Sequence, residues 1–118
     1  MTRVIVGLTL TAVLLVMLRL AFGSDCDQEV QQSLTSPDRR HTARIAIRSC
    51  GATVEFVTVV EVGRGESFTE ALAISGRTIL DLKWSDASDA LLIGVGATPA
   101  EKVYPKAREI DGVRVEVR

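Results

Sequence analysis

The stretch ARIAIR at residues 43–48 decides the fold, because apolar and charged side chains alternate along it. Ile45 and Ile47 fall on one face of an extended chain, and Arg44 and Arg48 fall on the other. This alternation, with β-branched residues on the apolar face, is typical of a strand with one side buried. The stretch therefore predicts a β-strand that covers an apolar core.

The same pattern recurs along the rest of the chain. Further strands are expected at residues 53–62, 80–84, 91–95 and 113–118. The pair Asp111-Gly112 favours a two-residue type I′ turn, because both residues tolerate positive φ. This turn implies one more strand at residues 103–110, in which Pro105 indicates a sheet edge.

Residues 53–62 are apolar on both faces at their centre, which predicts a central strand. One face is expected to carry Val54, Phe56, Thr58, Val60 and Val62. Glu55 and Glu61 are expected to point away from that face, with Val57 and Val59 partly covered beside them.

Two stretches lack the alternation and are not predicted as strands. Residues 24–37 are polar and indicate a loop or a short helical turn. Residues 67–75 include the helix-favouring tetrapeptide EALA, which is too short for a stable helix and indicates irregular structure or a single turn. The predicted fold is mainly β: a small antiparallel meander or sandwich of about six strands, with an open sheet or a partial barrel as alternatives.

Residues 1–23 have the pattern of an export signal. Arg3 precedes a 15-residue apolar run at residues 4–18, and the small-x-small tripeptide AFG ends at Gly23. Cleavage there would remove the signal helix and leave one domain at residues 24–118. An uncleaved membrane anchor is the alternative, although a bilayer core needs roughly 20 apolar residues. Lipidation of Cys26 is disfavoured because Asp25 precedes it.

Charge and cysteine content limit the cellular compartments and the classes of partner expected for the domain. Removing Arg3 and Arg19 leaves 12 of the 14 Lys and Arg residues against 15 Asp and Glu residues, a net charge of −3. This balance argues against nucleic acid, which needs a clustered basic face. Export would place Cys26 and Cys50, the only two cysteines, in an oxidising compartment. A Cys26–Cys50 disulfide is therefore predicted.

Several motifs carry a resemblance to a protein family: Asp25-Cys26, Ser36-Pro37-Asp38, Cys50-Gly51-Ala52-Thr53, Lys83-Trp84-Ser85, Leu91-Leu92-Ile93 and Asp111-Gly112-Val113. With them the chain resembles a family of small, uncharacterised exported bacterial proteins with the pattern Cys…Ser-Pro-Asp…Cys-Gly-Ala-Thr. The resemblance implies location and architecture only. Arg39 and Arg40 stand where relatives continue the first turn with Gly-Lys, so the turn geometry is expected to differ.

We identify no catalytic, cofactor-binding or metal-binding residues. His41 is the only histidine and is expected to be solvated or partly packed rather than a catalytic base. The acidic residues Asp81, Asp86 and Asp89 lack the glycine and closing glutamate of a calcium loop. The sequence GRGE at residues 63–66 is predicted to be a turn, since it lacks the rest of a phosphate-binding loop.

Two functions of different classes remain. The first is a non-enzymatic binding module of the envelope or exterior, whose partner is another envelope protein or a cell-wall component. Membrane contact would then come only through residues 1–23, if they stay uncleaved. The second is a small hydrolase that uses carboxylates such as Asp86 and Asp89. An exposed apolar patch would favour binding, and a deep pocket around perturbed carboxylates would favour an enzyme.

Overall fold

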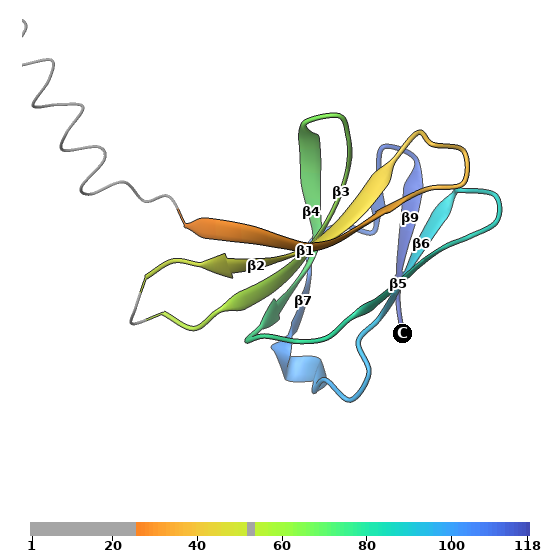
Figure 1. Ribbon diagram of the computed structural model, residues 1–118. Coiled ribbons are helices and arrows are strands. Elements are labelled where there is room, and N and C mark those ends of the chain that lie inside the picture. Colours follow the sequence, from red (N-terminus) through yellow and green to blue (C-terminus); the bar gives the residue numbers. More distant parts are fainter. Residues whose placement is uncertain (1–25, 52–53) are drawn as a thin grey trace, which may run out of the picture.

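The computed structural model describes residues 26–51 and 54–118, which form a β-sandwich (Figure 1). The predicted signal at residues 1–23 lies outside the described residues. The strands are β1 (Asp27–Thr35), β2 (Thr42–Ser49), β3 (Val57–Arg64), β4 (Ser67–Ser75), β5 (Asp81–Trp84), β6 (Ala90–Gly94), β7 (Val103–Pro105), β8 (Glu109–Ile110) and β9 (Val113–Val117). A short 3₁₀ helix, η1 (Ala100–Lys102), precedes β7.

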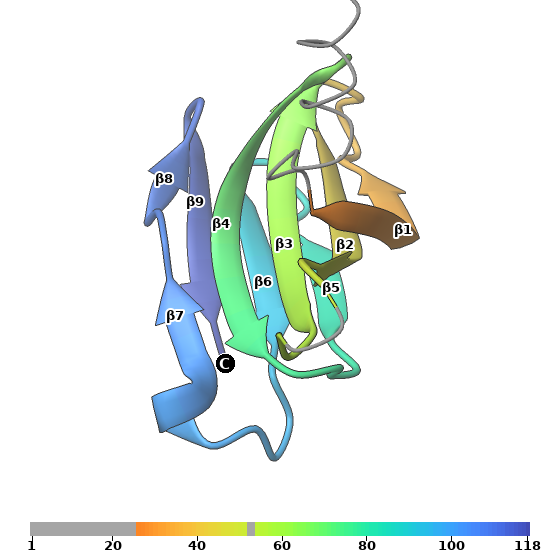
Figure 2. The same cartoon turned by 90° about the vertical axis from the view of Figure 1, so that its left-hand side faces the viewer.

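The strands form two sheets that face each other. One sheet has five strands in the order β1-β2-β3-β4-β7, and the other has four in the order β5-β6-β9-β8. Figure 2 shows β1 and β5 on one side of the sandwich and β7 and β8 on the opposite side. All neighbouring strands are antiparallel except β6 and β9, which are parallel. The parallel pair arises because the chain crosses to the first sheet as β7 before it returns.

The main core fills the space between the two sheets. The first sheet contributes Val60, Leu72 and Ile74, and the second contributes Leu91 and Ile93, all without solvent exposure. These residues alternate with outward-facing ones, as the apolar periodicity of the sequence requires. The mainly β fold expected from the sequence is confirmed, and of the forms left open it is a sandwich.

The central position predicted for residues 53–62 is also confirmed, although the strand is shorter. β3 lies between β2 and β4 and begins at Val57. Val59 is fully buried in a second, smaller cluster with Ala46 and Ala73, and Val57 packs against it. The prediction was wrong for Val54 and Phe56, which lie before the strand and are exposed. Alternation therefore located the strand but not its first residue.

Residues 67–75 form the strand β4, so the irregular structure expected there was wrong. β4 pairs with β3 along its length, and a bulge inserts Ala71 where Val60 and Glu61 face Leu72 and Glu70. The bulge shifts the side-chain alternation by one residue, which hid the strand from a period-two search. Pairing with β3 also overrides the weak helix propensity of this short segment.

The loop or helical turn expected at residues 24–37 was wrong for residues 27–35, which form β1. β1 pairs with β2 and nothing else in the described chain, and its side chains are almost all exposed. A strand with two solvated faces shows no apolar alternation in its sequence, which is why it was not predicted. Hydrogen bonds to β2 hold it in place.

The predicted strand at residues 103–110 is two short strands in different sheets. β7 pairs with β4, and β8 pairs with β9. Pro105 lies on an edge strand, as expected. The turn prediction is supported as well, because Asp111 and Gly112 both have positive φ, 49° and 82°.

Candidate functional site

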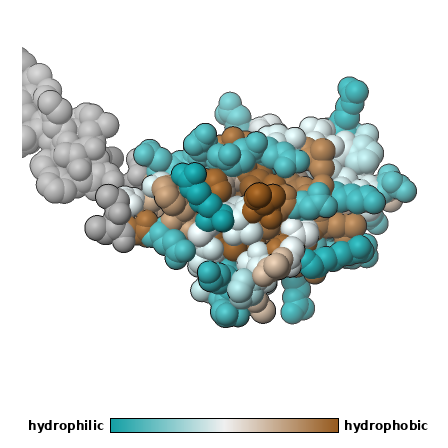
Figure 3. Space-filling model, turned by 60° about the horizontal axis from the view of Figure 1, so that its bottom comes forward, coloured by the Kyte–Doolittle hydropathy of each residue, from teal (hydrophilic) through white to brown (hydrophobic). Residues whose placement is uncertain are grey.

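An open groove of about 300 Å³ lies on the side of the sandwich where β1 and β5 are found. It is lined by Glu29, Gln31, Gln32, Ile45, Ile47, Arg77, Thr78, Ile79 and Leu80. The residues come from β1, from β2 and from the connection between β4 and β5. That connection runs along the lower side of the domain in Figure 1. Seen from below, the surface has an apolar patch ringed by hydrophilic side chains (Figure 3).

The floor of the groove consists of sheet residues that the second sheet does not cover completely. Ile45 and Ile47 are the apolar residues of the ARIAIR stretch and lie on β2. Ile45 also belongs to the main core, whereas Ile47 is only half-buried. The alternation that builds the core thus continues into a partly open apolar surface.

The connection between β4 and β5 forms the wall of the groove and is fixed by Thr58. The buried Thr58 hydroxyl donates a hydrogen bond to the Gly76 carbonyl, with an O···O distance of 2.7 Å, and accepts one from the Thr78 amide at 3.0 Å. Gly76 adopts a φ of 86°, which a residue with a side chain rarely adopts. The fixed backbone leaves the Ile79 side chain 96% exposed beside the groove.

A hydrogen bond joins β5 to β1. The Trp84 indole Nε1–H donates to the Leu34 carbonyl at 2.9 Å. Trp84 is buried in the core, whereas Tyr104 lies half-exposed on β7 in the other sheet. The two aromatic residues therefore do not form a common ligand platform.

The described lining of the groove contains two charged side chains, Glu29 and Arg77. The Arg77 guanidinium lies 4.3 Å from the centre of the Phe56 ring. Among the described residues, neither Glu29 nor Asp81 has an ion-pair partner. Asp81 follows Leu80 but does not line the groove: it is exposed and alternates along β5 with the buried Leu82. The described lining therefore carries one cation, Arg77, and one carboxylate, Glu29.

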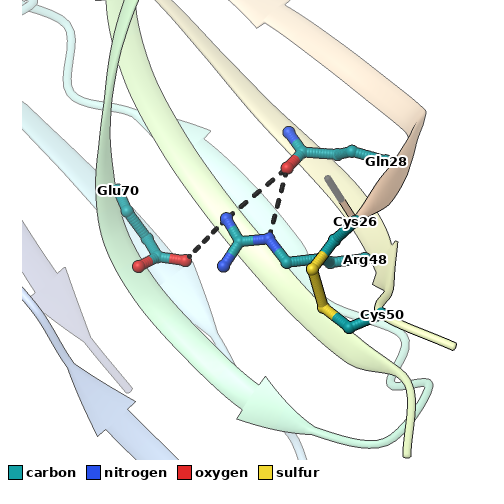
Figure 4. The surroundings of a disulfide bond; sticks show 5 residues. All are labelled: Cys26, Gln28, Arg48, Cys50 and Glu70. Atoms are coloured by element: carbon teal, nitrogen blue, oxygen red, sulfur yellow. Dashed lines mark hydrogen bonds and ion pairs between the residues drawn. A yellow bond between two sulfur atoms is a disulfide. The ribbon is translucent and has the colours of Figure 1, made fainter. Parts of the chain in front are cut away.

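The predicted disulfide is confirmed and lies where β1 begins and β2 ends (Figure 4). The Cys26 and Cys50 sulfur atoms are bonded, and the two Cα atoms are 4.2 Å apart. The bridge fixes the strand that forms one side of the groove. Since such bonds persist in oxidising compartments, it indicates a location outside the cytoplasm.

A polar network covers the outer face of the five-stranded sheet. Glu61, only 8% exposed, accepts hydrogen bonds from Gln28 and, at 3.3 Å, from Arg44. Arg48 contacts Gln28 at 3.4 Å and Glu70 at 3.2 Å, as Figure 4 shows. The network links β1, β2, β3 and β4, and its charged groups already have partners. It stabilises the sheet rather than offering a free site.

His41 is buried, contrary to the solvated or partly packed side chain expected. Its Nε2 lies 3.0 Å from the Asp111 carboxylate, and Arg64 Nε donates to the same oxygen at 2.9 Å. The imidazole lies 6.5 Å from the Trp84 ring. The hydrogen bond from His41, followed by the charge of Arg64, lowers the pKa of Asp111 below its ordinary value. His41 and Asp111 are 70 positions apart, so no local sequence motif predicts their contact.

The Ser36 hydroxyl does not form a nucleophile–base pair with His41. It donates to the Asp38 carboxylate at 2.6 Å and accepts from the His41 backbone amide at 3.2 Å. The Ser36 hydrogen bond is also the main cause that lowers the pKa of Asp38. The group therefore organises the turn between β1 and β2.

The acidic residues considered for a metal or for hydrolysis lie apart from the groove lining. Asp86 and Asp89 belong to the turn between β5 and β6, where Asp89 accepts a hydrogen bond from Ser85 at 2.8 Å. Within residues 26–51 and 54–118, no three His, Cys, Asp or Glu side chains are grouped so that they could hold a metal ion. No helix in the described part of the chain is long and apolar enough to cross a membrane.

Comparison with known proteins leaves the groove as the main guide to function. No family model, no curated protein and no solved structure matches the chain.

Proposed function

We propose that the chain is an exported, non-enzymatic binding domain that recognises an envelope protein or a cell-wall component through its groove. One observation carries this proposal: Ile79 is 96% exposed beside a partly open floor of isoleucines. When a partner covers an apolar groove and removes it from water, the free energy falls, which favours binding. The disulfide supports an extracytoplasmic location, and the resemblance to small exported bacterial proteins stays a prediction in agreement with it.

The alternative hydrolase finds less support in the geometry. Asp86 is exposed in a turn, and Asp89 is engaged with Ser85. Neither residue lines the groove, in which Glu29 is the only carboxylate among the described residues. A substrate bound over the isoleucine floor would therefore not meet the proposed pair of carboxylates.

Site-specific photo-crosslinking in the exporting cell tests the proposal. A photoreactive amino acid replaces Ile79 in the full-length chain, and a matched chain carries it at Val117, which is 41% exposed on β9. We expect an envelope partner to be crosslinked from position 79 and not from position 117. Equal yields at both positions, or no crosslinked product from position 79, would contradict a binding function of the groove.

A further inference from the structure

We propose that His41 is a proton-sensitive contact between the two sheets: its neutral imidazole joins the start of β2 to the turn between β8 and β9, and its protonation weakens that end of the sandwich. Three side chains, the His41 cluster, carry the proposal: His41, Arg64 and Asp111. They lie just before β2, at the end of β3 and in the turn between β8 and β9. None of the three lines the groove, so the crosslinking experiment and the one given below can fail independently.

The contacts of the imidazole indicate which of its nitrogens carries the proton when the ring is neutral. Nε2 lies 3.0 Å from the Asp111 carboxylate, which can only accept a hydrogen bond. Arg64 Nε is closer to that carboxylate, at 2.9 Å, than to the ring, at 3.4 Å, so its N–H is used by Asp111. Nδ1 is buried and has no hydrogen-bond partner among the described residues. The neutral ring is therefore expected to be protonated on Nε2, because the other tautomer would bury an unpaired N–H and leave two acceptors facing each other.

Protonation of the ring would create a second N–H group, on Nδ1. The His41 side chain is only 7% exposed, so this new donor would be removed from water. The described chain offers it no acceptor. A buried donor without a partner destabilises the folded state, and a buried charge does so more strongly.

The charged groups of the His41 cluster do not compensate for this cost. Arg64 Nε already donates to the same Asp111 oxygen that faces the ring, so a protonated His41 would make two cations share one carboxylate. Arg64 also lies beside the ring, which places the two positive charges next to each other. The Asp111 side chain is 58% exposed, so water weakens its attraction for the ring.

The other groups around the ring have little influence on its charge. In the turn between β1 and β2, the Asp38 carboxylate accepts from the Ser36 hydroxyl at 2.6 Å and from the Arg40 amide at 3.0 Å. The Ser36 hydrogen bond is the main cause that lowers the pKa of Asp38, and the charge of His41 is the smallest. Arg40 is exposed and opposite in charge to Asp38, so the two act on the ring in opposite directions. From β5, the ring faces the uncharged indole of Trp84.

The stability of the domain should therefore fall over the range in which histidine gains its proton. Histidine is the side chain that ordinarily changes charge between about pH 8 and about pH 5. In the unfolded chain the ring takes up its proton in water without these costs. The unfolded state then binds more protons, so the free energy of unfolding falls as the pH falls. This range lies above the one in which Asp111 and Asp38 titrate, because their pKa values are lowered from 3.8.

Two measurements on the exported, oxidised protein test the proposal. Nuclear magnetic resonance of the labelled imidazole nitrogens reports the tautomer, and the signals are unambiguous because His41 is the only histidine. We expect the proton on Nε2 at about pH 7.5. Urea denaturation should show that the folding equilibrium constant falls about tenfold between about pH 7.5 and about pH 5. A neutral ring protonated on Nδ1, or a stability that is unchanged or higher at the lower pH, would overturn the proposal.

Variants assign the pH dependence to the ring. His41→Gln keeps a donor for Asp111 but cannot gain a proton, so its folding equilibrium constant should change less than about twofold over the same range. Arg40→Gln is the matched control: it removes an exposed charge from the same turn, keeps the ring and should show the tenfold loss of the parent. A loss in His41→Gln as large as that of the parent would assign the effect to other groups and overturn the proposal.

Arg64→Gln provides a second variant if His41→Gln does not fold. Its position is exposed at the end of β3, and the substitution leaves the protonated ring as the only cation on Asp111. The loss between about pH 7.5 and about pH 5 should then be at least about twofold smaller than in the parent, because a charge-assisted hydrogen bond to Asp111 stabilises the protonated ring. A loss equal to that of the parent would contradict the competition between the two cations and overturn the proposal.

Discussion

At the scale of single residues, Thr58 determines how the groove is presented. Its side chain is fully buried on β3, yet both of its hydrogen bonds go to the connection between β4 and β5. Buried polar groups are costly unless they have partners, so this connection is held at a defined distance from the sheet. The exposed position of Ile79 therefore depends on Thr58, whose own side chain is buried.

Replacement of Thr58 by valine should therefore destabilise the domain. Valine has a similar shape but leaves the Gly76 carbonyl and the Thr78 amide without their side-chain partner. We expect the free energy of unfolding to fall by about 1–3 kcal/mol, measured by urea denaturation. Thr35→Val on the exposed β1 is the control and should change it by less than about 0.5 kcal/mol. Equal effects of the two substitutions would contradict the role assigned to Thr58.

The contact between His41 and Asp111 makes stability depend on acidity. Because the pKa of Asp111 is lowered from 3.8 in the folded protein, its carboxylate contributes stability above that pH. The contribution is lost as the pH falls through the lower, folded value. The pKa of Asp38 is also lowered, so its stabilising contribution is likewise lost as the pH falls.

An Asp111→Asn variant should accordingly lose less stability on acidification than the parent. The measurement is the urea midpoint of each protein at about pH 6 and about pH 2, on either side of the expected transition. Asp86→Asn, at an exposed position of the turn between β5 and β6, should keep the acid sensitivity of the parent. A parent and an Asp111→Asn variant with the same acid sensitivity would show that Asp111 does not contribute.

At the scale of elements, β1 is the strand that depends most on its connections. It is an edge strand with exposed side chains, and it contributes only Leu34 to the periphery of the main core. Its position comes from pairing with β2, from the Trp84 contact at one end and from the disulfide at the other. One side of the groove is thus held by hydrogen bonds and a covalent link instead of apolar burial.

Loss of the disulfide should loosen β1 first. The bridge joins residues 24 positions apart, and closing such a loop contributes about 3 kcal/mol in the chain-entropy description. Cys26→Ser combined with Cys50→Ser should lower the free energy of unfolding by about this amount. It should also speed amide exchange in residues 27–35 more than in β3. Reduction of the parent protein is the control and should give the same change; an unchanged stability in both would contradict this role.

At the scale of the whole molecule, the two sides of the sandwich are closed differently. On one side, β7 lies at the edge of the first sheet and continues to β8 in the second. On the other side, β1 and β5 meet at Trp84, and the groove lies beside them toward residues 77–80. A partner would therefore approach the side of β1 and β5, which is also the side where the described chain begins.

The proposed export predicts the residue at which the mature protein begins. Cleavage after Gly23 would give a chain that starts at Ser24, two residues before the disulfide. Intact mass spectrometry of the protein from the extracytoplasmic fraction checks this start, with whole-cell precursor as the control. Retention of residues 1–23 in a membrane fraction would favour the anchor over the cleaved signal.

The sequence by itself determined the mainly β fold, the central place of β3, the C-terminal turn and the disulfide. These features follow from local alternation, from turn residues such as Asp111-Gly112, or from there being only two cysteines. Only the tertiary structure decided that β1 and β4 are strands, because a solvated edge and a bulge both erase the period-two signal. It also decided the candidate site. The groove depends on how far one sheet extends beyond the other and on long-range hydrogen bonds such as those of Thr58, and neither leaves a pattern in neighbouring residues.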